Sequence, residues 1–94
     1  MHTKRTGRTT QQMTAAPRGA VFVWGNENVY YPRSLAKALG RDDLVVRPMS
    51  WLEPHNFESR DFPGVVVDHA ALPGRHAAIV LNYLRARGVP VSDQ

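Results

Sequence analysis

Residues 64–74, GVVVDHAALPG, decide the fold, because an unbroken run of three valines stands directly before an acid and a turn. An unbroken apolar run, unlike an alternating one, is typical of a strand covered on both faces, as in parallel sheets. Residues 72–88 then repeat apolar side chains at helical spacing and end in arginines and Gly88, which are typical of a helix C-terminus. This stretch therefore predicts a buried parallel strand followed by a crossover helix.

The rest of the chain repeats this alternation of apolar run and helix. Residues 20–25 (AVFVWG) and 44–49 (LVVRPM) are two further apolar runs, and residues 33–40 between them predict a helix that ends at a glycine. Pro48 weakens the end of the second run and indicates an edge strand, since proline cannot donate a hydrogen bond to a neighbouring strand. Residues 89–91 (VPV) predict a last, short strand.

Strands that are joined by helices through right-handed crossovers form a doubly wound sheet. We therefore expect an α/β domain of Rossmann-like or flavodoxin-like type, with two main helices and a mostly parallel four-stranded sheet. The expected order is 2-1-3-4, with strands numbered along the chain. Residues 50–63 predict a loop with at most a short helix, because Pro54 interrupts it. A single small domain is expected over residues 20–94.

The first 19 residues are rich in Thr, Gln, Gly and Arg, with no periodic apolar side chains, and predict a disordered tail. The formal net charge of the chain is +4, and this segment carries all of it, since residues 20–94 hold eight basic and eight acidic side chains. Either the segment is a solvated leader, or it is an arm that binds nucleic acid or another acidic partner. The basic residues of that arm are Lys4, Arg5, Arg8 and Arg18.

The composition narrows the possible chemistry. The chain has no cysteine, which excludes disulfides, thiolate metal sites and a cysteine nucleophile. No apolar run approaches the roughly 20 residues that span a bilayer, so no membrane partner is expected. No apolar segment of a signal peptide follows the basic N-terminus, and a cytoplasmic location is expected.

In open α/β sheets, ligands gather beyond the carboxyl ends of the strands, where the winding reverses. With the order 2-1-3-4, that point lies between the first and third strands. Asn26, Glu27 and Asn28 follow the first strand, and Asp68 and His69 follow the third. These oxygen ligands suit Mg²⁺, and Glu27, Asp68 and His69 are candidate catalytic groups. Alternatively, the same residues only cap the strand ends.

No other cofactor is predicted. No pair of histidines has the close spacing of a zinc motif, and GNENVYY after the first strand contains no glycine fingerprint for a nucleotide. The aromatic 50–63 loop is the candidate surface for a protein partner or a second copy of the chain, because aromatic side chains dominate interface hot spots. Its contact residues would be Trp51, His55, Phe57 and Arg60. These features favour a small non-catalytic regulatory or binding module, of a size typical of phage or mobile-element accessory proteins.

From Phe62 to Val91 the chain resembles the middle of a response-regulator receiver domain. That family has a strand ending in a phosphoacceptor aspartate, a Leu-Pro-Gly loop, an amphipathic helix and a strand that begins Val-Pro-Val. The resemblance implies that Asp68 is a phosphoacceptor and that Glu27 belongs to an Mg²⁺ site. Here Glu27 is the one acid where the family has an acidic pair, and a Pro-containing loop replaces the second helix.

Overall fold

The computed structural model describes residues 4–57, 62–71 and 73–92, and describes side chains from residue 7 onward. The elements, in chain order, are α1 (Lys4–Ala15), β1 (Val21–Trp24), α2 (Tyr30–Ala38), β2 (Val45–Pro48), the 3-10 turns η1 (Met49–Trp51) and η2 (Pro54–Phe57), β3 (Val65–Val67), α3 (Arg75–Ala86) and β4 (Val91–Ser92). The four strands are parallel and lie in the order β2-β1-β3-β4, which confirms the predicted sheet.

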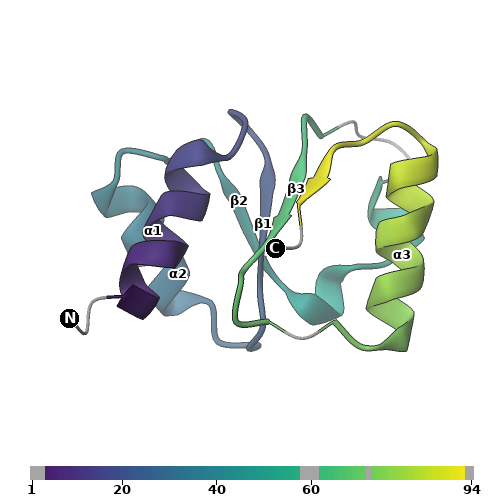
Figure 1. Ribbon diagram of the computed structural model, residues 1–94, viewed down its shortest axis with the longest axis horizontal. Coiled ribbons are helices and arrows are strands. Elements are labelled where there is room, and N and C mark those ends of the chain that lie inside the picture. The colour runs from purple at the N-terminus through teal and green to yellow at the C-terminus, as the bar shows by residue number, and fades with distance from the viewer. Residues whose placement is uncertain (1–3, 58–61, 72, 93–94) are drawn as a thin grey trace.

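The sheet is covered on both faces, with α1 and α2 on one side and α3 on the other (Figure 1). Successive strand residues alternate between two cores. Val21, Val23, Val65 and Val67 pack on the α3 side, while Phe22, Val46 and Val66 pack beneath α1 and α2. The unbroken apolar runs exist because each face of the central strands needs its own apolar side chains.

The prediction of a disordered tail over residues 1–19 is wrong for its described part, because α1 is a third helix of the domain. Thr9 and Met13 lie on one face of the helix, and Ala16 follows its last residue; the three are 4%, 0% and 8% exposed. The spacing of these three residues is helical, but only Met13 is large and apolar, so the periodic signal is weak. Without α1, the side of the sheet that carries Phe22 and Val66 would lack cover over β3. None of the helices in the described part is long and apolar enough to span a membrane.

Arg41, in the loop between α2 and β2, closes the C-terminal end of α1. Its guanidinium donates to the carbonyl oxygens of Met13 and Thr14, and Nη2 donates to Ala16 at 2.9 Å. The last carbonyls of a helix have no partner within the helix and carry its negative partial charge, which a cation satisfies. Arg41 therefore fixes the end of α1 against the start of β1.

Asp43 holds Arg41 in place, and we call this pair of residues the clamp. Its two carboxylate oxygens each accept from the guanidinium of Arg41 at 3.0 Å, and Oδ2 also accepts from the backbone N–H of Gly19 at 2.7 Å. Gly19 has a φ of 80°, a conformation that glycine adopts without strain. The hydrogen bond from Arg41, followed by that from Gly19, holds the pKa of Asp43 well below its usual range.

The packing of α1 leads to a stability prediction. We expect Met13→Ala to lower the free energy of unfolding by about 2–5 kcal/mol, because it removes buried atoms and leaves a cavity under α1. Urea unfolding followed by circular dichroism measures the change. Thr14→Ala, on the exposed side of the same helix, is the control. Equal, small effects of both substitutions would mean that α1 does not pack on the sheet.

The lowered pKa of Asp43 leads to a pH prediction. Because the folded-state pKa lies below the unfolded one, the clamp stabilises the fold fully above about pH 4 and loses this contribution as the pH falls. We expect the free energy of unfolding to fall less between about pH 5 and pH 2 in Arg41→Gln than in the parent protein. The slope of urea stability against pH is the measurement, and identical slopes would contradict the assignment.

Candidate functional site

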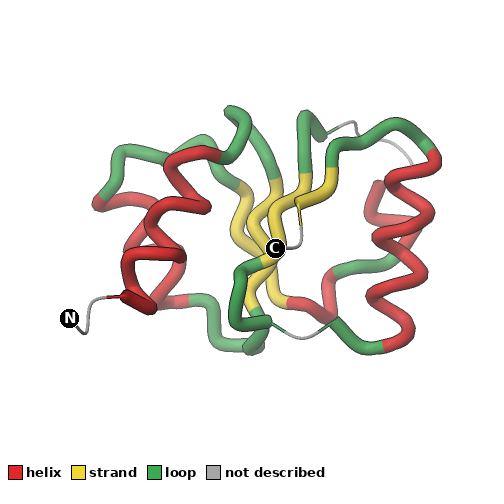
Figure 2. Tube along the Cα trace, viewed as in Figure 1, coloured by secondary structure: helices red, strands yellow, loops and turns green. Residues whose placement is uncertain are grey.

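The loops that follow β1 and β3 lie side by side at the carboxyl edge of the sheet, as predicted (Figure 2). The backbone N–H of Asp68 donates to Val23 at 3.0 Å, which extends the pairing of the two strands by one residue. A side chain at Gly25 would place its Cβ 3.2 Å from the Cβ of Ala71, so glycine allows the two loops to touch. Between them lies a shallow hollow of about 390 Å³. Its lining residues are Trp24, Gly25, Asn26, Asp68, Ala70 and Ala71.

Asp68 contributes to the wall of this hollow, but both of its carboxylate oxygens are bonded inside the protein. Oδ1 accepts from the hydroxyl of Thr9 on α1 at 2.9 Å, and Oδ2 accepts from the backbone N–H of Ala70 at 3.1 Å. Asp68 is 3% exposed. The side chain that the sequence offers as a reactive carboxylate therefore attaches α1 to the end of β3.

His69 takes part in the same attachment. Gln12 of α1 donates to the carbonyl oxygen of Val67 at 2.9 Å, and its Oε1 accepts from the backbone N–H of His69 at 2.9 Å. The Nδ1 of His69 lies 3.3 Å from that Oε1 and 3.5 Å from Oδ1 of Asp68. With 11% of its side chain exposed, the imidazole is largely enclosed instead of presented to a substrate.

The three polar residues after β1 form an exposed turn. Asn26 Oδ1 accepts from the N–H of Asn28 at 2.8 Å, and Asn28 Oδ1 accepts from the N–H of Tyr30 at 3.1 Å. These are local turn bonds, and the second one satisfies a free N–H group at the start of α2. Glu27 is exposed at the tip of this turn. Nowhere in the described ranges do three or more His, Asp or Glu side chains gather in a group that could hold a metal ion.

An aromatic surface lies next to this turn, away from the 50–63 loop that the sequence analysis favours as the partner surface. Trp24 and Tyr31 lie with their ring centroids 5.7 Å apart, and Trp24 also lines the hollow. Tyr30 and Tyr31 are 76% and 46% exposed. We call Trp24, Tyr30 and Tyr31 the aromatic rim. Tyr30 and Tyr31 precede the predicted helix at residues 33–40, whereas in the structure they begin α2 on its exposed side.

In the described part of the 50–63 loop, Phe57 is a core residue, which corrects its assignment as a contact residue of a partner surface. Phe57 is 2% exposed and packs edge-to-face against Trp51 and Phe62, with centroid distances of 5.0 and 5.5 Å. Trp51 is partly buried by the same cluster, and His55 is exposed. Arg60 lies outside the described residues. The aromatic bulk is needed because α3 alone does not cover this side of the sheet beside β2.

Of the basic residues assigned to nucleic-acid binding, Arg8 and Arg18 are exposed. The side chains of Lys4 and Arg5 lie outside the described part of the chain. Because Arg8 belongs to α1 and Arg18 to the turn that Arg41 and Asp43 clamp, these charges have fixed positions on the domain. A deletion of residues 1–19 would therefore remove part of the core together with the charges.

A comparison of the chain with protein-family models, with curated proteins and with solved structures gives no match. The resemblance to receiver domains therefore stays a prediction, and the fold and geometry described above carry the functional argument.

The bond between Thr9 and Asp68 leads to a stability prediction at the site. We expect Thr9→Val to lower the free energy of unfolding by about 1–3 kcal/mol, because it leaves a buried carboxylate oxygen without its donor. Thr14→Val, on the exposed side of α1, is the matched control, and urea unfolding measures both. A Thr9→Val protein as stable as the control would mean that Asp68 does not need α1 and is open to solvent.

Proposed function

We propose that the protein is a small non-catalytic binding module that engages a protein partner through the aromatic rim. The observation that carries this proposal is the exposure of Tyr30, at 76%, beside the half-exposed Tyr31. Tyrosine offers a large contact area together with a hydroxyl, which makes it one of the commonest energetic anchors of protein interfaces.

The surroundings of the rim support the same function. Trp24 packs against Tyr31 from the end of β1, and Asn28 holds the backbone of Tyr30 through its amide oxygen. An aromatic surface held in this way loses little conformational freedom on binding, so less of the contact energy is offset by ordering. The hollow beside Trp24 offers space for a side chain of the partner.

Phosphotransfer or Mg²⁺-dependent catalysis at Asp68 is the rival function, and the bonding of this residue argues against it. An attacking carboxylate needs a free oxygen and access for the substrate, whereas both oxygens of Asp68 accept bonds from Thr9 and Ala70. For this reason, the bonding of Asp68 at the carboxyl edge supports a binding role better than a catalytic one.

Site-specific crosslinking tests the proposed function. We expect the photoreactive residue benzoylphenylalanine in place of Tyr30 to give one discrete protein adduct in an extract of the producing cells. The Tyr31→Ser substitution should lower its yield about tenfold, as the loss of an interface anchor does. Benzoylphenylalanine in place of Ile79, which is 60% exposed on α3 across the sheet, is the matched control.

Equal adducts from positions 30 and 79, or none from position 30, would contradict a partner surface at the aromatic rim. An adduct that disappears on nuclease treatment would instead identify the partner as a nucleic acid.

A further inference from the structure

The two edges of the sheet differ in how well they are protected. At the β2 edge, Val45 donates its N–H to Ala20 at 2.9 Å, so the alternation of the strand turns the backbone groups of Val46 away from β1. Arg47 donates from Nη1 to the outward carbonyl oxygen of Val46 at 3.2 Å. Pro48, the next outward position, has no N–H. Such features prevent another strand from adding to an edge.

Within the described part of the chain, the β4 edge has no comparable protection. Val65 of β3 donates to the carbonyl oxygen of Pro90 at 2.9 Å, so the same alternation turns the N–H and C=O of Val91 outward. Val91 can donate and accept there, and β4 is the outermost strand among the described residues. This edge can therefore accept a further strand.

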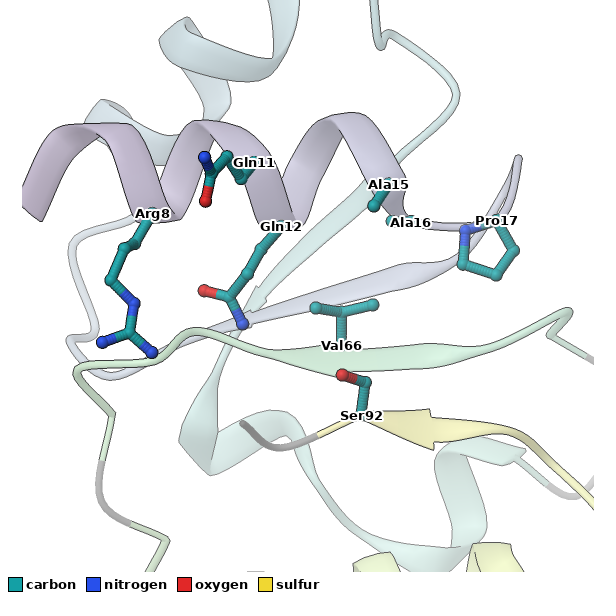
Figure 3. Close-up of a pocket in the computed structure, with 8 residues that line it drawn as sticks. All are labelled: Arg8, Gln11, Gln12, Ala15, Ala16, Pro17, Val66 and Ser92. Atoms are coloured by element: carbon teal, nitrogen blue, oxygen red, sulfur yellow. The ribbon is translucent and has the colours of Figure 1, made fainter. Parts of the chain in front are cut away.

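A groove runs beside this edge, between α1 and strands β3 and β4 (Figure 3). It has a volume of about 330 Å³ and shares three of its lining residues with a second hollow of about 190 Å³ that continues toward Pro90 and Val91. The shared residues are Pro17, Val66 and Ser92. The small side chains of Ala15, Ala16 and Ser92 leave the space open, and Val66 gives it an apolar floor.

The charge of the groove indicates what would occupy it. Arg8 is exposed at one end, and no described residue pairs with its guanidinium. Among the residues that the structure describes, no acid lines either hollow. An occupant with a carboxylate at this end would form a charge-assisted hydrogen bond with Arg8.

We propose that the groove binds an extended segment of a protein partner, which adds to β4 as a fifth strand. Apolar side chains of the segment lie over Ala15 and Val66, and an acidic side chain meets Arg8. A second copy of this chain fits less well, because antiparallel pairing of two β4 strands brings residues 87–90 (RGVP) toward Arg8, and they contain an arginine and no acid. This site is separate from the aromatic rim and does not depend on it.

A selection on the full chain tests the proposal, with a random peptide library displayed on phage as the probe. The library is first incubated with the Ala15→Trp variant, in which the tryptophan fills the groove. Peptides that bind this variant bind elsewhere on the protein and are discarded. We expect the remaining peptides to alternate apolar residues and to carry Asp or Glu at one end. A selected peptide is then synthesised and added to the isotope-labelled protein. In the NMR spectrum it should shift the amide signals of Val66, Val91 and Ser92.

Three variants then test the contacts. Arg8→Gln should weaken the acidic peptide about tenfold but leave its Asp→Asn or Glu→Gln counterpart unchanged. Val91→Pro, which removes the outward N–H, should abolish binding, while Val91→Thr retains it.

A library with no binder left after the depletion, or peptides that shift the amide signals of residues 24–31 instead, would overturn the proposal. Self-association of the parent protein that rises with concentration and is abolished by Val91→Pro would also overturn the proposal. In that case a second copy of the chain would occupy the β4 edge.

Discussion

The structure depends on one constraint, the need to cover the face of the sheet that carries Phe22 and Val66. The crossover helix α2 covers the β2 side of this face, and α1, beside α2 on the same face, covers the rest (Figure 1). Only Met13 contributes a large apolar side chain from α1 to the core. Polar contacts therefore determine where α1 lies along the strands, with Arg41 at its C-terminal end and Asp68 near its N-terminal half.

This attachment determines which side chains the carboxyl edge of the sheet leaves open to solvent. In a doubly wound sheet the residues after β1 and β3 are the expected place for catalysis. Here α1 runs antiparallel to the strands, so Thr9 and Gln12 reach the end of β3 and bond Asp68, Val67 and His69. Asp68 and His69 are thereby bonded into the contact between α1 and the end of β3. The surface that stays open at this edge holds the aromatic rim beside the exposed polar turn of residues 26–28.

The same helix creates the groove on its other flank. Since α1 lies over β1 and β3, the strip beside β4 keeps its space between small side chains, with Arg8 at one end. The opposite edge at β2 is closed by Arg47 and Pro48. The domain thus presents one edge that resists strand addition and one that allows it, and both properties follow from side chains on the outermost strands.

Local pattern was sufficient to predict the parallel strands, their order, the edge position of Pro48 and the meeting of the loops after β1 and β3. Each of these depends on hydrophobic runs and turn residues that are close together in the chain. The tertiary structure alone decided that residues 4–15 form a covering helix, that Phe57 belongs to the core and that Asp68 is bonded to Thr9, 59 residues away. Contacts between residues so distant leave no periodic pattern, because they depend on which face of the sheet still needs cover once the local elements have packed.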